Sequence, residues 1–297
     1  MADSLRTLMA RVAPMRPDLN QGGLVDFWIQ ESLRRICRET NLYRETLAVQ
    51  PVLGNSDTLT VTPSNGYNIK RVEYVKGATG LFSNAAYQGA WNASTNTPAI
   101  TTGSSDSANA GQFYIVTVAG TTTVDGTSTW NVGDIIQSSG SLWTRFAIET
   151  FPVLSEINVP TVNYAIPLSQ SNASTLLQWG QTIQNPTGTI IWYPRSLYDT
   201  AVQILISEVP VGELTDIGTL PVEVEDAIVE GALAQILNLP SALPGMQNLA
   251  LAQDYHMRFE RSLANLKGRA LLGFGASPRA IPPNFTGTWA YTSYWTM

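Results

Sequence analysis

A long internal run with almost no charge constrains this fold more than any other feature. Between about Gly80 and Phe146 the sequence is dominated by Thr, Ser, Asn and Gly. Its charged residues are Asp106, Asp125, Asp134 and Arg145 alone. Helix signals are missing, whereas "FYIVTVAG" and "WNVGDIIQSSGSLWTRF" have the β-branched and aromatic content of strands separated by glycine turns. The run therefore predicts a small all-β module inserted at residues 81–146.

The chain resumes its earlier character after this module, so the two flanks are expected to form one core. Residues 24–40 place apolar residues at helical spacing, which predicts an amphipathic helix, and residues 2–12 predict a shorter one. In "LTVTPSNGYNIKRVEYV" the alternation on both sides of Ser-Asn-Gly predicts a hairpin, and "GTIIWYPRSLYDTAVQILISEVP" predicts two strands around a turn. We expect residues 1–80 and 147–272 to form an α+β core, with a helical bundle and an antiparallel β-sandwich-like middle.

Two further helices are predicted near the C-terminus. The first covers "LPVEVEDAIVEGALAQILNLP", with Pro221 near its start, and it ends at Pro240. The second runs from Met246 to about Arg269. Its inward side is expected to carry Leu249, Ala250, Met257, Leu263 and Leu266. The first helix also gathers acids at its start, namely Glu223, Glu225, Asp226 and Glu230. Acids at this place match the positive end of the helix dipole.

Residues 273–297 are expected to form an extended C-terminal arm. The segment combines Gly, Pro and aromatic residues without a helical or strand period, so it has no pattern by which to pack on itself. Its aromatic residues are Phe274, Phe285, Trp289, Tyr291, Tyr294 and Trp295. Exposed aromatic side chains of this kind are typical of a binding segment that a partner covers.

Charge and cysteine content exclude several classes of protein. Charged residues make up only 13% of the chain and the net charge is -6, which argues against a protein that grips nucleic-acid phosphates. The single cysteine, Cys37, has no partner for an internal disulfide and is expected to be a buried apolar residue in a reducing compartment. No apolar run is long enough to predict a membrane-spanning helix.

The sequence gives little support to catalysis. Its one histidine, His256, lies in the middle of a predicted helix, and metal and nucleotide motifs such as HExxH, CxxC and GxGxxG are missing. We therefore expect no enzyme and no cofactor, metal or catalytic residue. Among the aromatic residues of the module, Trp130 and Trp143 are expected in its core, whereas Trp91 lies in a polar run and is a candidate for stacking on a sugar.

The order of these parts resembles the head-to-tail adaptor (connector) proteins of tailed bacteriophages. The resemblance covers about 20–80 and 150–275, and its most specific part is the helix pair "LPVEVEDAIVEGALAQIL" and "LALAQDYHMRFERSLANLKGRA". It implies a ring, commonly of twelve copies, that lies under the portal and continues its DNA channel, with the C-terminal extension of each copy embracing the portal. The implied partners are the portal protein, a tail or nozzle protein, further copies of the chain, and genomic DNA that passes without sequence recognition. The implied place is the head–tail junction of the virion, after assembly in the host cytoplasm.

The inserted module is similar to a small β repeat of phage tail, baseplate and fibre proteins. The similarity rests on the pattern "YxGxW…GxFYxV…xVGDxI…G…W". It leaves open an alternative, a tail or fibre component whose module binds a host glycan, and a glycan-degrading enzyme is a more distant one. For the adaptor, the acids Glu223, Glu225, Asp226 and Glu230 are expected either to face the channel or only to match the helix dipole.

Overall fold

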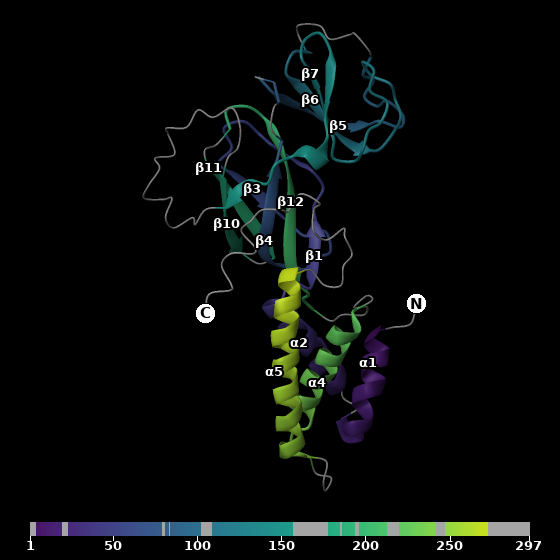
Figure 1. Ribbon diagram of the computed structural model, residues 1–297, viewed down its shortest axis with the longest axis vertical. Helices are drawn as coiled ribbons and strands as arrows, with labels where there is room; N and C mark the ends of the chain where they lie inside the picture. The colour runs from purple at the N-terminus through teal and green to yellow at the C-terminus, as the bar shows by residue number, and fades with distance from the viewer. Residues whose placement is uncertain are drawn as a thin grey trace. The chain divides into compact units, whose positions relative to one another are not determined.

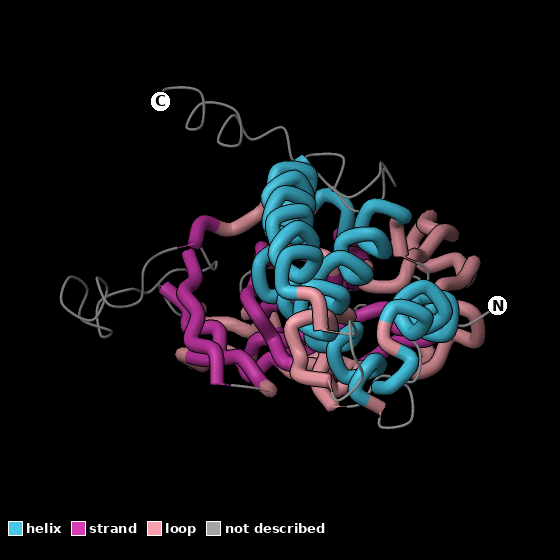
Figure 2. The backbone as a smooth tube through the Cα atoms, turned by 90° about the horizontal axis from the view of Figure 1, so that it is seen from below, coloured by secondary structure: helices cyan, strands magenta, loops and turns pink. Residues whose placement is uncertain are grey.

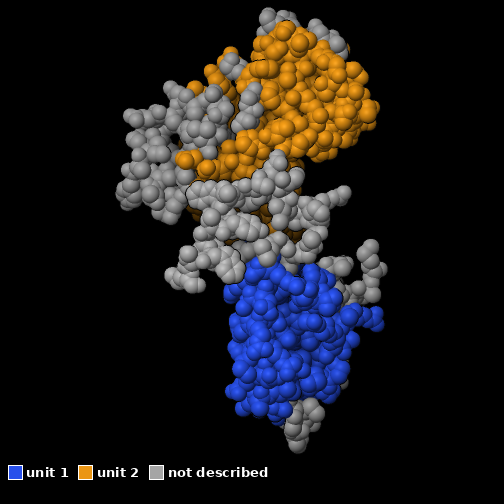
Figure 3. Space-filling model, in the orientation of Figure 1, with its two compact units in different colours: residues 1–43, 209–297 blue, residues 44–208 orange. Residues whose placement is uncertain are grey.

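Helices and strands occupy different stretches of this chain, so the fold is α+β, as the sequence predicts. In the computed structural model the chain forms two compact units, which we call the helical unit (Met1–Tyr43 and Val209–Met297) and the β unit (Arg44–Glu208) (Figure 3). The structure describes residues 4–19, 23–78, 81–82, 84–101, 109–156, 178–184, 186–193, 196–212, 220–241 and 247–272.

The described part of the helical unit contains four α-helices. They are α1 (Ser4–Val12), α2 (Leu24–Glu39), α4 (Val222–Ile236) and α5 (Leu249–Leu272), as Figure 1 shows. Helix α4 packs against each of the other three, and it is buried on most sides. In Figure 2 the four helices lie close together, although α1 and α2 are separated from α4 and α5 by the whole β unit in sequence.

A glycine in the middle of α4 sets how closely its neighbours approach. A Cβ added to Gly231 would lie 2.8 Å from the Ser32 hydroxyl oxygen and 3.0 Å from the ring of Phe259, so α2 and α5 both touch α4 at this point. The contact fixes which side of α5 is buried. Among residues 249–269 of α5, the buried ones are Ala252, Phe259, Leu263 and Leu266. The predicted inward positions Leu263 and Leu266 are therefore confirmed.

The other inward positions predicted for α5 are wrong. Leu249, Ala250 and Met257 are exposed, and Met257 leaves 61% of its surface open to solvent. Helical spacing from Phe259 reaches Leu263 and Leu266 but passes over Met257, so the two apolar rows cannot face inward together. The ring contact with Gly231 selects the row that contains Phe259.

The described residues of the β unit form three sheets. Its strands are β1 (Tyr43–Thr46), β2 (Gln50–Val52), β3 (Thr58–Val61), β4 (Asn68–Gly77), β5 (Ala86–Asn92), β6 (Gln112–Val118), β7 (Ile135–Ser138), β8 (Trp143–Phe146), β9 (Ser155–Glu156), β10 (Gln178–Gln184), β11 (Thr187–Tyr193) and β12 (Thr200–Val209). One sheet has the order β1-β12-β2, with β4 also on β12, and the second has the order β3-β11-β10-β9. Both sheets contribute side chains to one hydrophobic core.

The predicted hairpin around Ser-Asn-Gly is wrong. β3 pairs with β11 in one sheet, whereas β4 pairs with β12 in the other, so the turn carries the chain from sheet to sheet. The turn itself forms as its residues favour, since Gly66 has a positive φ of 73° and the Asn65 side chain accepts a hydrogen bond from the Tyr67 amide. Alternation and turn chemistry identify two strands and a turn, but they do not say which strands pair.

The third sheet, β5-β6-β7-β8, lies wholly within residues 81–146, and we call it the insert sheet. The strands predicted in "FYIVTVAG" and in "WNVGDIIQSSGSLWTRF" correspond to β6, β7 and β8, and β7 and β8 form an antiparallel pair. Its separate core is built around Trp91, Trp130 and Trp143. This stretch therefore contains a hydrophobic cluster of its own, within the larger β unit.

The chain leaves for the insert sheet and returns from it at neighbouring points. Lys76 forms an antiparallel bridge with Val153, and the Gly77 amide donates to the Pro152 carbonyl at 3.1 Å. The insert sheet also packs on the rest of the β unit through a second cluster. This cluster joins Phe113, Ile115 and Ile135 of the sheet to Ala78, Phe151 and Ala201 outside it. The insert sheet is therefore held to the rest of the β unit by hydrophobic packing as well as by its two chain connections.

Candidate functional site

Two of the acids at the start of α4 form ion pairs with other helices. Glu223 accepts from Arg269 of α5 at 2.5 Å, and Asp226 accepts from Arg11 of α1 at 2.6 Å. The hydrogen bond from Arg269 lowers the pKa of Glu223 below its ordinary value. Both pairs are about half exposed, so each stabilises the contact only modestly.

The other two acids are less exposed. Glu230 accepts a hydrogen bond from the Ser262 hydroxyl of α5 at 2.7 Å, and Glu225 is half-buried. Three of the four predicted site acids thus bridge α4 to its neighbours. A channel-facing role for these acids stays a prediction, and the cross-helix contacts give them a structural role besides the helix dipole.

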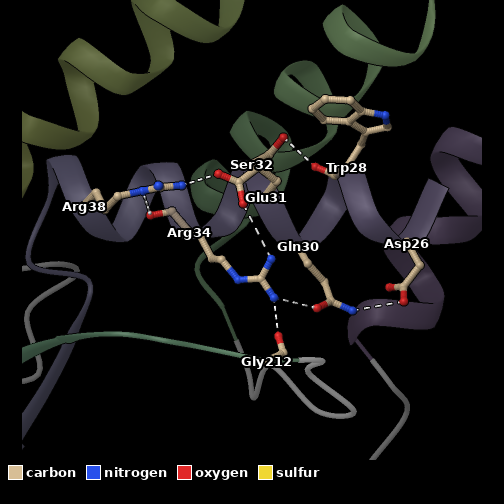
Figure 4. Close-up of polar contacts among 8 residues, drawn as sticks. All are labelled: Asp26, Trp28, Gln30, Glu31, Ser32, Arg34, Arg38 and Gly212. Carbon is tan, nitrogen blue, oxygen red and sulfur yellow. Dashed lines mark hydrogen bonds and ion pairs between the residues drawn. The ribbon is translucent and has the colours of Figure 1, made fainter. Parts of the chain in front are cut away.

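The polar surface of α2 forms a connected chain of contacts, shown in Figure 4. Gln30 donates to Asp26 at 2.9 Å and accepts from Arg34 at 3.1 Å, and Arg34 also donates to the carbonyl of Gly212. Glu31 pairs with Arg34 and with Arg38. The arginines of α2 are therefore held by carboxylates and by a backbone carbonyl, and their charges are largely compensated.

A buried arginine that sequence patterns do not reveal fastens the end of α4. The Arg16 side chain is fully buried and donates to the carbonyls of Ile236 at 2.6 Å and Leu239 at 3.0 Å. It also donates to both carboxylate oxygens of Asp18 at 2.8 Å. A cation suits the negative end of a helix, where carbonyls lack amide partners. The closeness of Arg16 and Asp18 in sequence is the only signal that could have indicated the pair.

The candidate sugar-stacking residue is part of the core of the insert sheet. Trp91 is completely buried, and its ring meets that of Trp130 edge to face with centroids 4.9 Å apart. Its indole nitrogen donates to Asn96 at 3.1 Å. A ring enclosed in this way has no free face for a sugar, so we do not propose Trp91 as a stacking residue. Trp130 and Trp143 are buried as predicted.

Asp134, in the "VGDxI" part of the insert pattern, is a buried structural residue. Its carboxylate accepts from Arg145 at 2.7 Å, from the Asn131 amide at 2.7 Å and from the Ile148 amide at 3.1 Å. The side chain is fully buried, and these three donors compensate its charge. The Asp in this pattern therefore joins the end of the insert sheet to the segment that follows it.

The remaining candidates behave as ordinary structural residues. His256 is half exposed on α5, 3.9 Å from Glu260, and Cys37 is fully buried in α2 as expected. Within the described ranges, no His, Cys, Asp and Glu side chains gather closely enough to hold a metal ion. Nor does any helix there combine the length and hydropathy that a membrane span requires.

The predicted arm residues lie outside the described part of the chain. They are Phe274, Phe285, Trp289, Tyr291, Tyr294 and Trp295. Comparison with known proteins adds no assignment for the arm or for the other sites. No protein-family model matches the chain, and none of the curated proteins compared with it does either.

Proposed function

We propose that this chain is a structural virion protein that forms a ring between the capsid portal and the tail of a bacteriophage. The ring continues the DNA channel of the portal, and the arm at residues 273–297 docks on the portal. Copies assemble in the host cytoplasm, the resemblance implies twelve of them in a ring, and the protein carries out no reaction. In the same proposal the four helices form a bundle, and the two sheets that share a core form a β-sandwich.

The packing of α4 is the observation that supports this proposal most. The helix pair at Leu220–Ala270 carries the most specific resemblance to the adaptors, and α4 and α5 pack against each other within it. The N-terminal helices α1 and α2 complete the same unit. A resemblance in the order of the parts is thus accompanied by a contact between parts far apart in sequence.

The charge pairing of the helical unit also supports passage of DNA. A wall with free cations would bind phosphates, release counterions and hold the duplex. Four cations of this unit lie beside acids, in the pairs Arg11–Asp226, Arg35–Glu260, Lys267–Glu39 and Arg269–Glu223. Such pairs leave a surface little net charge with which to grip DNA, which suits a channel through which DNA slides.

The direct test is imaging of the purified full-length protein, alone and mixed with its portal protein. We expect rings with a central hole that bind end-on to the portal. Particle mass, measured by mass photometry at micromolar concentration, gives the copy number. A protein that remains monomeric in both samples would contradict the proposal.

The arm needs a separate test, because ring formation and portal docking are different steps. We expect Trp289→Ser with Trp295→Ser to leave rings intact and to weaken portal binding at least about tenfold, since buried aromatic residues dominate many interfaces. Thr288→Ser with Thr296→Ser is the matched control, which changes the same part of the arm without removing an aromatic side chain. Equal portal affinity of the two double variants would exclude the arm as the docking segment.

The glycan-binding alternative does not gain support from the structure. Its candidate residue, Trp91, is enclosed in the core of the insert sheet. We therefore propose no second function.

A further inference from the structure

The inward row of β12 ends in a carboxylic acid. Val202, Ile204 and Ile206 lie in the core shared by the two sheets, and Glu208 follows at the same alternation. A strand places every second side chain on one face, so Glu208 continues the apolar row. Only 2% of its surface is exposed. A carboxylic acid in this position requires partners or a proton.

Only one of the two oxygens of Glu208 has a donor. Oε2 accepts from the Asn65 side-chain amide, in the turn between β3 and β4, at 2.8 Å. Oε1 is buried, and no described residue donates a hydrogen bond to it. An ionised carboxylate only accepts hydrogen bonds, so this oxygen would be left unsatisfied if Glu208 were charged.

A second carboxyl group lies beside the first. Glu45 of β1 is within hydrogen-bonding reach of Glu208, and it accepts from the amide of Ser64 at 3.1 Å and from the hydroxyl of the same residue. Two neighbouring carboxylates repel each other when both are ionised, and one proton shared between them removes the repulsion. A proton on the Glu208 carboxyl supplies a donor toward Glu45, removes the repulsion between the two groups and leaves no buried charge on the oxygen that lacks a donor.

The neighbouring strands carry further charged groups, namely Arg44 of β1 and Lys70, Arg71, Glu73 and Lys76 of β4. On the neighbouring strands, Arg44 acts on Tyr74, and Arg71 pairs with Glu156 at 2.6 Å. Glu73 is the one acid of β4, and among the described residues Glu45 is the charged group that raises the pKa of Glu208. Burial, opposed by Asn65 and reinforced by Glu45, raises the pKa of Glu208 to about 7.

We propose that Glu45, Ser64, Asn65 and Glu208 form a proton-dependent latch, which fastens the β3–β4 turn across β1 and β12. The latch joins the two ends of the β unit in sequence, since Glu208 is its last residue and Glu45 is its second. Gain of the proton closes the latch, and its loss places two negative charges side by side and loosens the turn. This inference does not depend on the proposed function.

The direction of the pH dependence follows from the raised pKa. A carboxyl group that holds its proton more tightly when folded stabilises the fold fully below its ordinary pKa of 4.5. That contribution is lost as the pH rises from 4.5 through about 7. The latch is therefore closed in mildly acidic solution and opens in alkaline solution.

Hydrogen exchange of the full-length protein at pH 5.5 and 8.5 tests the latch. After correction for intrinsic exchange, we expect protection of the Ser64 amide to fall about tenfold at the higher pH, because local opening is coupled to loss of the proton. Glu208→Gln, which keeps a donor toward Glu45 and an acceptor toward Asn65, should abolish this difference. Glu149→Gln, a change at an exposed acid, should leave it as in the unmodified protein.

Carboxyl NMR of the unmodified protein gives a second measurement that does not depend on the folding of any variant. We expect the Glu208 carboxyl carbon to titrate near pH 7. Titration near the ordinary glutamate value would overturn the proposal, and so would a Glu208→Gln protein that keeps the full pH difference in protection.

Discussion

The helical unit and the insert sheet hold their shapes by opposite means. Across its helices the helical unit has many ion pairs, such as Arg269–Glu223, in which both side chains are more than half exposed. The insert sheet has few charged residues and relies on a pair of buried tryptophans and on the buried carboxylate of Asp134. The helical unit is stabilised by many weak contacts, whereas the insert sheet is stabilised by a few buried residues.

This difference teaches where single substitutions matter. Exposed ion pairs contribute little individually, so a surface with many of them tolerates the loss of any one. A small sheet with few large residues depends on each of them, because each supplies a large share of the buried apolar area. Arg16 is the exception in the helical unit, since it is a charged group that is completely buried.

The largest effect is expected from Trp91→Ala in the insert sheet. Removal of a fully buried tryptophan should lower the free energy of unfolding of this sheet by about 4 kcal/mol. Hydrogen exchange of the β5–β8 amides in the full-length protein measures the loss locally. Val118→Ala, at a 44% exposed position of β6, is the control and should change little. A loss below about 1 kcal/mol would mean that Trp91 is not a core residue.

Arg16→Met should have the next largest effect. It should be an exception to the expectation that loss of a single charged side chain in the helical unit costs little stability. The variant leaves buried carbonyls at the end of α4 without their donor, which should cost about 3 kcal/mol in free energy of unfolding. Urea denaturation followed by far-UV circular dichroism measures this loss. Arg6→Met, at an exposed position of α1, is the matched control and should lie within about 0.5 kcal/mol of the parent protein.

The titration of Asp18 adds a pH test of the same contact. The hydrogen bond from Arg16 lowers the pKa of Asp18 to about 2, so this group stabilises the fold above its ordinary pKa of 3.8. That contribution is lost as the pH falls through about 2. In Arg16→Met the Asp18 carboxyl should titrate near its ordinary value, as carboxyl NMR can show. An unchanged titration would exclude Arg16 as the cause.

Two glycine substitutions should have smaller effects of opposite sign. Gly231→Ala should destabilise the helical unit by about 1 to 2 kcal/mol, because the added methyl group meets Ser32 and Phe259 although alanine favours helix. Gly268→Ala on α5 adds a methyl group that meets no atom within 4 Å, and it should stabilise the helix by about 0.5 kcal/mol. Thermal denaturation of the two variants side by side measures the contrast. Stabilisation by both would show that α4 and its neighbours are not in close contact.

The smallest effect is expected for the pair of Glu223 and Arg269. A double-mutant cycle with Glu223→Gln and Arg269→Gln should give a coupling energy close to zero, which falls further with added salt. A coupling as large as the destabilisation expected for Arg16→Met would remove the contrast between the two regions.

Helix positions could be predicted from the sequence, whereas strand partners and buried polar contacts could not. Apolar spacing places the helix predicted at 24–40 within one residue of α2, but it does not choose between the two apolar rows of α5. It also gives no clear indication of β10. In β10 the polar residue Gln181 lies between the core residues Trp179 and Ile183 and interrupts their apolar alternation. Its side chain accepts a hydrogen bond from the Val72 amide and donates one to the Val72 carbonyl.

The candidate site was predictable to a smaller extent. The sequence pattern places Glu223 and Asp226 at a helix start. It does not identify their ion-pair partners, Arg269 and Arg11, which are distant in sequence. The roles of Arg16 and Glu208 are likewise set by contacts that only the folded chain brings together. Local sequence patterns indicate which side of a helix or strand a residue occupies. They do not indicate which distant residue packs against that side.

The bridge between Lys76 and Val153 has a consequence for how such a chain changes over evolutionary time. Because the two ends of the inserted segment lie next to each other, one segment can be exchanged for another without altering the strands that flank it. A replacement would still have to bring an apolar surface of its own, since Phe151 and Ala201 require a cover. The inserted segment and the strands that flank it can therefore have different evolutionary histories.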